Sequence, residues 1–274
     1  MIIGSTGYYV SPSDSVAIIA ANAVDCIPYF RRRKYLKGVA RSMPTSSALD
    51  RVADVISLGG RELKCYEVPT GWKFFCNLMD ADKVDICGEE SFGAGSSHLR
   101  EKDGIWVALA WLSIMARHKK PIKEIVINHW RKFGRHFYTR YDYENLSSVQ
   151  GRDVMMQLQT LIDSGLKGTA YKTETRGYVV ELADNFLYLD PIDNSLAAGQ
   201  GYRIIFTNKD RLVVRLSGTG SCGSTIRLYM EHFETDTENI FKDTQEMLKD
   251  LIEISLEITK IKKFTTRDAP TVVS

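Results

Sequence analysis

A change of hydrophobic pattern near Gly134 most constrains what this chain can fold into. Before it, helical segments alternate with short strand-like runs, which is typical of a mixed, mainly parallel sheet with flanking helices. After it, most apolar segments are strand-like, with a helical segment at 148–164 and a long one at 238–261. The sequence therefore predicts an α/β domain over 18–134, followed by an antiparallel-sheet α+β domain over 135–274.

Helix-start signals and amphipathic spacing predict five helices in the first domain. We expect them over 12–20, after Pro44, and over 71–79, 104–118 and 121–133. On the last of these, His129 is expected to be a packing or capping residue rather than a ligand. Asp103 is a typical N-cap for the fourth of these helices. On that helix Ile105, Leu109, Leu112 and Met115 form an apolar stripe, which Trp106 and Trp111 broaden, and we expect this apolar surface to belong to the core.

Composition narrows the class of protein. With 274 residues, 44% of them hydrophobic, the chain is long enough for two domains that each bury a core. A net charge of +2 is too small for a nucleic-acid surface, and we interpret the basic run at 31–34 as a solvated loop. Five scattered cysteines predict reduced, mostly buried thiols in a cytoplasmic protein. The most apolar stretch is too short to span a membrane.

Residues 215–227 combine two arginines with glycine, serine and threonine on a strand-like background. Glycine lets a backbone approach an anion closely, and hydroxyl groups add hydrogen-bond donors. Arg215 and Arg227 would supply permanent charges for phosphate oxygens. A flexible hairpin turn is the alternative for a motif this short. The segment predicts either a phosphate-binding cradle or a plain turn.

A second signature is the strand, polar loop and helix that follow one another over 84–118. Loops at the carboxyl ends of strands are common ligand sites in α/β proteins. This loop carries carboxylates and hydroxyl groups, which together suit the hydroxyl groups of a sugar. The adjacent Glu89 and Glu90 also suggest acid–base chemistry, although neighbouring side chains of a loop need not face the same side.

Distinctive motifs are spread over essentially the whole chain. The strongest are GEESFG at 88–93, REKDG at 100–104, RLSGTGS at 215–221 and TIRLY at 225–229. Further motifs lie at 11–16, 40–46, 69–75, 77–80 and 269–273. In this order, they resemble the phosphoglucomutases of the α-phosphohexomutase superfamily.

The resemblance implies four domains, of which this chain matches the third and fourth. Phosphoglucomutases carry a phosphorylatable serine in a Thr-Ala-Ser-His-Asn-Pro loop and bind magnesium through an Asp-Gly-Asp-Gly-Asp-Arg loop. Neither motif occurs in this sequence. Residues 1–4 resemble the strand after the magnesium loop, so we expect 1–17 to be a remnant of the second domain. We therefore expect a truncated, carboxyl-terminal half without catalytic residues or metal ligands.

The resemblance also implies roles for individual residues. Glu90 is expected to be structural, while His98 and Arg100 have weaker claims to substrate contact. Contacts to the sugar are implied for Thr70, Glu89, Ser91 and Lys102. Contacts to the phosphate are implied for Arg215, Ser217, Gly218, Thr219, Gly220 and Arg227.

The implied function is one half of an enzyme of carbohydrate metabolism that interconverts glucose 1-phosphate and glucose 6-phosphate. The reaction would pass through glucose 1,6-bisphosphate, with magnesium as cofactor of the complete enzyme. We expect a hexose phosphate and a separate amino-terminal half as partners, no nucleic acid or membrane, and no activity of this chain alone. The alternative is a non-catalytic phosphosugar-binding or structural interaction protein, because the superfamily includes members without activity.

Overall fold

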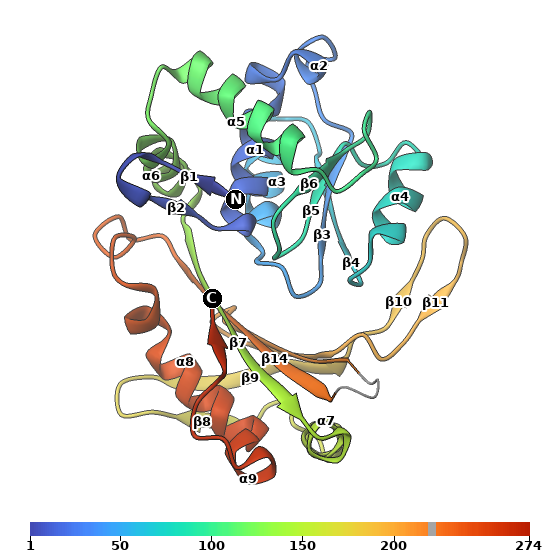
Figure 1. The fold of residues 1–274 in the computed structure, drawn as a ribbon, viewed down its shortest axis with the longest axis vertical. Helices are drawn as coiled ribbons and strands as arrows, with labels where there is room; N and C mark the ends of the chain where they lie inside the picture. Colours follow the sequence, from blue (N-terminus) through green and yellow to red (C-terminus); the bar gives the residue numbers. More distant parts are fainter. Residues whose placement is uncertain (219–222) are drawn as a thin grey trace. The chain divides into compact units, whose positions relative to one another are not determined.

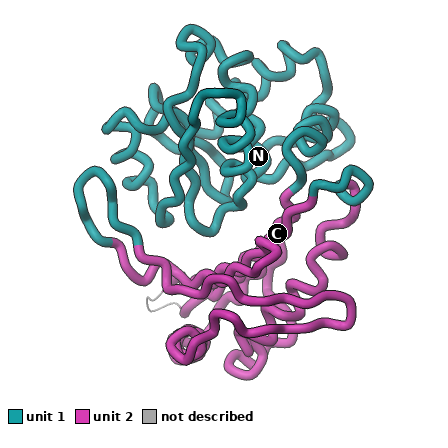
Figure 2. Tube along the Cα trace, turned by 180° about the vertical axis from the view of Figure 1, so that it is seen from behind, with its two compact units in different colours: residues 1–135, 188–196, 235–240 teal, residues 136–187, 197–234, 241–274 magenta. Residues whose placement is uncertain are grey.

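The computed structural model describes residues 1–218 and 223–274. These residues form two compact units, shown in different colours in Figure 2. Unit 1 comprises residues 1–135, 188–196 and 235–240, and unit 2 comprises residues 136–187, 197–234 and 241–274. The domain boundaries expected from the sequence remain a prediction.

The sheet of unit 1 has four strands in the order β4-β3-β5-β6 (Figure 1). The central strand β3 pairs in parallel with β4 and β5, while β6 is antiparallel to β5. The strands are β3 (Gly38–Ser42), β4 (Lys64–Val68), β5 (Ile86–Gly88) and β6 (Ala94–Ser96). A mixed, mainly parallel sheet with flanking helices was the fold class predicted for the first domain, and it is confirmed.

The helices of unit 1 begin where the sequence signals place them. Ser11 caps α1 by accepting a hydrogen bond from the backbone N–H of Asp14, and Asp103 caps α5 in the same way. The helices are α1 (Pro12–Cys26), α2 (Pro28–Arg31), α3 (Ala48–Leu58), α4 (Trp72–Asp80), α5 (Gly104–His118) and α6 (Ile122–Phe133). Helix α1 is the centre of the core, with Ile18 and Ile19 fully buried.

The core face expected on α5 is right for Trp106 and Trp111, which are buried, and wrong for the narrower stripe. Ile105, Leu109 and Leu112 are 75%, 57% and 60% exposed, and Met115 is only partly buried. The helix instead buries the opposite face, formed by Trp106, Val107, Ala110, Trp111 and Ile114. Both faces are apolar, so periodicity alone could not choose between them; the two tryptophans bury more area and decide the orientation.

The residues before α1 form a small ribbon in unit 1. Strands β1 (Ile2–Ile3) and β2 (Tyr9–Val10) pair antiparallel around the short helix η1 (Ser5–Gly7). The hairpin of β10 (Tyr188–Leu189) and β11 (Leu196–Ala197) also contributes to unit 1. Within that unit, Asn77 of α4 donates a hydrogen bond to Asp190 at 2.9 Å.

Unit 2 is built on a seven-stranded sheet in the order β15-β7-β14-β13-β12-β9-β8. Its register places β12, β13 and β14 in one antiparallel meander, with a tight turn at residues 208–210 between β12 and β13. The strands are β7 (Arg135–Leu146), β8 (Ala170–Lys172), β9 (Gly177–Asn185), β12 (Tyr202–Phe206), β13 (Arg211–Ser217), β14 (Ser224–Glu234) and β15 (Val272–Val273). The predicted antiparallel α+β class is therefore confirmed.

The helices of unit 2 lie on one side of this sheet in Figure 1. They are α7 (Ser148–Asp163), α8 (Thr244–Thr259) and α9 (Ile261–Thr265). The helix expected from residue 238 begins later because Asp243 caps it, and Lys260, in a left-handed conformation, ends it. No helix within the described ranges is long and apolar enough to cross a membrane.

Three smaller sequence interpretations can also be compared with the structure. Cys26 and Cys87 are buried free thiols, while Cys65 and Cys76 are free and partly exposed; burial raises the pKa of the Cys87 thiol well above its usual value. His129 is buried with its ring 4.6 Å from that of Phe133, which confirms the packing role expected from its position. The basic run at 31–34 is only partly a solvated loop, because Arg33 pairs with Asp85.

Candidate functional site

The first cluster of predicted site residues lies on the hairpin formed by β5 and β6. Gly88 pairs with Ala94, so residues 89–93 form the tip of the hairpin. Glu89 and Ser91 belong to this tip, which we call the hexose loop after the role that the family resemblance implies for it. Glu90 accepts a hydrogen bond from Ser42 at 3.4 Å. Adjacent glutamates therefore have different surroundings, as expected for neighbouring residues of a loop.

Lys102 completes this cluster. Its Nζ donates to Glu89 Oε2 at 2.6 Å and also to Ser91 Oγ. The backbone N–H of Asp103 donates to the carbonyl of Ala94 at 3.0 Å. This bond holds the preceding residue, Lys102, close to the hairpin tip. The N–H of Gly71 lies 3.5 Å from Glu89 Oε1, so the turn of Thr70 and Gly71 adjoins the same carboxylate. Lys102 thus contacts two of the other predicted sugar-contact residues, Glu89 and Ser91. The fourth, Thr70, directly precedes Gly71, whose N–H approaches the Glu89 carboxylate.

This arrangement offers both kinds of hydrogen-bonding partner to a ligand. The Glu89 carboxylate accepts hydrogen bonds, the Lys102 ammonium donates them, and the Ser91 hydroxyl does both. The Glu89 and Lys102 side chains are 14% and 31% exposed, so they are held by the protein yet remain accessible to solvent. Opposite charges within 2.6 Å also balance Glu89 against Lys102. The cluster is suited to neutral polar groups such as sugar hydroxyls.

Helix α4 supports the base of the hexose loop. The indole N–H of Trp72 donates to the carbonyl of Arg100 at 2.9 Å, and Arg100 forms an ion pair with Asp80 at the end of the same helix. Gly95 lies so close to this helix that a Cβ there would be 2.5 Å from Trp72 Cζ2. Only glycine fits there without displacing the indole ring, so the base of the hairpin is tightly packed.

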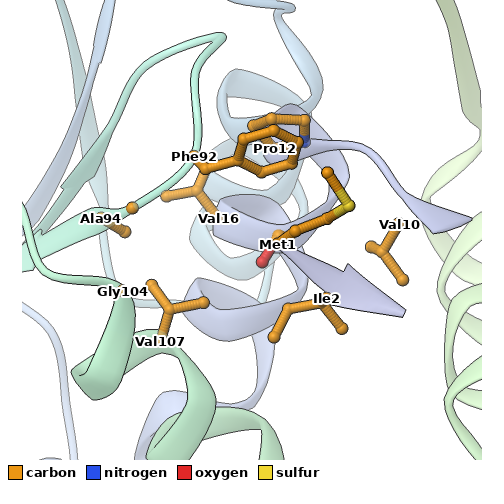
Figure 3. Close-up of a pocket in the computed structure, with 11 residues that line it drawn as sticks. Met1, Ile2, Val10, Pro12, Val16, Phe92, Ala94, Gly104 and Val107 are labelled. Atoms are coloured by element: carbon orange, nitrogen blue, oxygen red, sulfur yellow. The ribbon is translucent and has the colours of Figure 1, made fainter. Parts of the chain in front are cut away.

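Phe92 anchors the tip on its other side. Its ring meets that of Tyr9 edge-on at 6.2 Å. Figure 3 shows Phe92 beside Pro12 and Val16 in a pocket that Met1 and Val107 also line. The pocket holds about 20 Å³, room for roughly one water molecule, and is far too small for a sugar phosphate. It is a packing feature that supports the hexose loop.

His98 packs beside the base of the hexose loop. Its ring lies 4.2 Å from that of Tyr29, and its Nδ1 lies 2.6 Å from Ser96 Oγ. Partial burial lowers the pKa of His98, while the negative charge of Asp85 acts in the opposite direction. These contacts explain His98 as part of the packing, without reference to a ligand.

The second cluster lies in unit 2, where Arg215 of β13 and Arg227 of β14 face each other in the register. Like charges directly opposite on neighbouring strands are destabilising. Arg215 Nε donates to the carbonyl of Gln200 at 3.3 Å. Arg227 Nε is buried without a hydrogen-bond partner among the described residues, and the nearest carboxylate oxygen, from Asp142, is 3.7 Å away. The structure thus concentrates positive charge at one position of the sheet.

The turn beside these arginines is only partly described. Ser217 Oγ lies 3.4 Å from the carbonyl of Thr225, across the strand pair. Gly218 has a φ of 72°, a left-handed conformation that glycine adopts without strain. Thr219 and Gly220, the two other predicted phosphate contacts, lie outside the described residues.

Sequence reasoning missed two charged neighbours of the arginine pair. Asp142 is buried on β7 and accepts a hydrogen bond from Arg140 Nε at 2.8 Å. Burial opposes the positive charge of Arg140, but Asp142 outweighs this effect, and the pKa of Arg140 is raised. The only available signal was charged residues at alternate positions of a strand, which usually indicates an exposed face.

The residues described here do not provide a metal centre. Within 1–218 and 223–274, no three His, Cys, Asp or Glu side chains are grouped so that they could hold a metal ion. The magnesium implied by the family resemblance therefore has no fitting ligand set in this part of the chain, and no catalytic step is assigned to it.

Comparison with known proteins identifies the class from which this fold and these clusters come. Residues 12–133 match the family model of the phosphoglucomutase/phosphomannomutase alpha/beta/alpha domain III. Residues 135–271 match the model of the phosphoglucomutase-1 C-terminal domain. The chain belongs to the phosphoglucomutase family.

Individual relatives agree with this assignment. The chain is 51% identical to phosphoglucomutase-1 of Homo sapiens and 52% identical to the cytoplasmic phosphoglucomutase of Solanum tuberosum, and the match covers all of this chain in both cases. It spans 48% of the length of either relative. An open-form crystal structure of the Paramecium phosphoglucomutase pp63/parafusin superposes with a TM-score of 0.84 at 44% identity, covering 98% of this chain and 44% of that one.

Proposed function

We propose that this chain is the substrate-binding half of a phosphoglucomutase that interconverts glucose 1-phosphate and glucose 6-phosphate. Thr70, Glu89, Ser91 and Lys102 would bind the ring hydroxyls. The turn between β13 and β14, with Arg215 and Arg227, would bind the phosphate that is not being transferred; Ser217, Gly218, Thr219 and Gly220 would line it.

The observation that carries this proposal is the facing pair of Arg215 and Arg227. Two guanidinium groups directly opposite each other cost stability in an empty protein. A phosphate dianion would remove that cost, because it can accept charge-assisted hydrogen bonds from both side chains. The buried Nε of Arg227, which lacks a hydrogen-bond partner within the described ranges, is a donor available for such an oxygen.

The proposed role in catalysis is positional. Binding energy from a phosphate remote from the reacting hydroxyl can hold that hydroxyl in a productive orientation, which lowers the entropic part of the barrier. An intermediate such as glucose 1,6-bisphosphate would allow either end of the sugar to occupy the same cradle. The complete enzyme would also require magnesium. The phosphoryl-carrying serine and the metal ligands would have to come from an amino-terminal half.

The proposal is tested by assaying conversion of glucose 1-phosphate to glucose 6-phosphate with magnesium and glucose 1,6-bisphosphate. We expect no turnover from the 274-residue chain alone and measurable turnover when the separately expressed amino-terminal half of human phosphoglucomutase-1 is added. The same mixture with Arg227→Ala provides the control for specific complementation. Turnover by this chain alone would contradict the division of roles.

A binding measurement tests substrate recognition without requiring complementation. By NMR titration, the chain should bind glucose 1-phosphate more tightly than inorganic phosphate, and both more tightly than glucose. Absence of phosphate binding would contradict the role of Arg215 and Arg227 as a phosphate site. Equal affinities for glucose 1-phosphate and inorganic phosphate would contradict the role of the hexose loop in binding the sugar.

A further inference from the structure

Arg33 connects the basic run at 31–34 to a fully buried carboxylate in unit 1. Its Nη1 and Nη2 donate to Asp85 Oδ1 and Oδ2 at 2.8 and 2.7 Å. The Asp85 side chain is 0% exposed and that of Arg33 is 23% exposed. This bidentate geometry is the strongest form of an arginine–carboxylate contact. Arg31 and Arg32, in contrast, are exposed.

Asp85 lies at the open end of the β5–β6 hairpin. Ser97, just after β6, donates its hydroxyl to Asp85 Oδ1 at 2.8 Å and its backbone N–H to the Asp85 carbonyl at 2.9 Å. The remaining contact to the carboxylate comes from the N–H of Lys37 at 2.7 Å. Asp85 therefore joins the two ends of the hairpin, and Arg33 and Lys37 fix the carboxylate that joins them.

The segment that begins at Ser97 continues to Lys102, whose ammonium contacts Glu89 and Ser91 at the hairpin tip. A second contact links this segment to the residues before Arg33, since the ring of His98 lies 4.2 Å from that of Tyr29. Residues 29–33 therefore contact this region at two points: Asp85, where the hairpin begins, and His98, in the segment that leads to Lys102.

We propose that Arg33 is a positioning residue of the hexose loop. Through Asp85 and Ser97, it fixes the base from which Glu89, Ser91 and Lys102 are presented to the sugar. The proposal rests on the hexose-binding role given above and adds a residue that would act without touching the ligand. Hydrogen bonds to sugar hydroxyls depend steeply on geometry, so a small shift of the base should weaken sugar binding and leave phosphate binding intact.

The test compares Kd for inorganic phosphate with Kd for glucose 1-phosphate in the 274-residue chain by NMR titration. Kd for inorganic phosphate divided by Kd for glucose 1-phosphate reports how much the sugar contributes to binding. We expect Arg33→Gln to lower this ratio by about tenfold, an order-of-magnitude value for a mispositioned contact. The amide resonances of Ser91 and Lys102 should shift, and Kd for inorganic phosphate should stay within about twofold of the parent. Arg32→Gln, in the same basic run, should change none of these quantities.

Two further variants keep the test decisive if Arg33→Gln fails to fold, since that change leaves a buried carboxylate without its cation. Arg33→Gln/Asp85→Asn removes both charges together, and Ser97→Ala removes a single hydrogen bond. Both should lower the ratio. If the parent prefers glucose 1-phosphate and the folded variants keep that preference, the positioning role is overturned while the proposed function stands. If the parent shows no preference, the hexose-binding function fails, and the positioning role fails with it.

Discussion

The hexose loop of unit 1 and the arginine pair of unit 2 handle charge in opposite ways. In the hexose loop, Glu89 and Lys102 neutralise each other at 2.6 Å. In unit 2, Arg215 and Arg227 face each other across two strands, and the carboxylate nearest to Arg227 is 3.7 Å away. A site for neutral hydroxyl groups can be balanced in charge before it binds, whereas a site for a dianion requires an excess of positive charge. The comparison predicts which ligand each cluster selects.

The largest effect is expected from Arg227→Ala. Loss of a charge-assisted contact to phosphate should weaken binding of both inorganic phosphate and glucose 1-phosphate by roughly 10- to 100-fold. Arg227→Lys should recover only part of this loss because an ammonium cannot bind two oxygens as a guanidinium does. Isothermal titration calorimetry measures the affinity of the parent and of both variants for each of the two ligands. The exposed Arg152→Ala serves as the control, and equal weakening in both alanine variants would show a general charge effect.

Gly95→Ala should reveal how rigid the base of the hexose loop is. Its new methyl group would meet Trp72 at 2.5 Å and Cys87 Sγ at 2.9 Å, so we expect a loss of about 1–3 kcal/mol in the free energy of unfolding. Chemical denaturation followed by circular dichroism measures it. Gly104→Ala is a matched control, because nothing lies within 4 Å of the added Cβ. Equal stability of the two variants would mean that the base yields easily.

Glu89→Gln tests whether the hexose loop contributes to sugar binding alone and not to phosphate binding. We expect affinity for glucose 1-phosphate to fall by about five- to tenfold, because a carboxylate acceptor becomes a neutral amide, while affinity for inorganic phosphate stays unchanged. The neighbouring Glu90→Gln should have a smaller effect on either ligand. These constants come from the same calorimetric titrations. A loss of phosphate affinity in Glu89→Gln would contradict the separation of roles.

The smallest effect concerns pH. Folding lowers the pKa of His98 below its ordinary value of 6.5, so the unfolded chain takes up this proton first as the pH falls. The free energy of unfolding should therefore decrease as the pH drops from about 6.5 to the pKa of His98 in the folded chain. Below that pKa, the loss caused by His98 should stay constant. Denaturation of the parent and His98→Gln at a series of pH values measures the difference. An NMR midpoint for His98 above 6.5 would reverse the expected sign.

Local signals in the sequence were sufficient for most helix starts. Ser11 and Asp103 cap helices through contacts that span three residues, so their effect does not depend on the rest of the fold. The GEESFG motif is likewise short and continuous in sequence, and it coincides with Gly88 and the hairpin tip that follows it.

What could not be predicted depends on contacts between distant residues. Arg33 and Asp85 are 52 positions apart, and nothing in a basic run shows which of its members meets a buried carboxylate. The orientation of α5 failed for a similar reason, because two apolar faces competed and only the packing of Trp106 and Trp111 against the rest of unit 1 selected one. Asp142 and Arg227 likewise come from strands far apart along the chain.

The short tip of the β5–β6 hairpin has a practical consequence for protein engineering. Only residues 89–93 separate Gly88 from Ala94, and the strands below them are closed by backbone pairing. Changes of sugar preference should therefore be sought by randomising Glu89, Ser91 and Lys102, with Phe92, Gly93 and the strand residues kept constant. A library of three positions can be screened exhaustively for discrimination between epimeric hexose phosphates, on a scaffold whose packing contacts are unchanged.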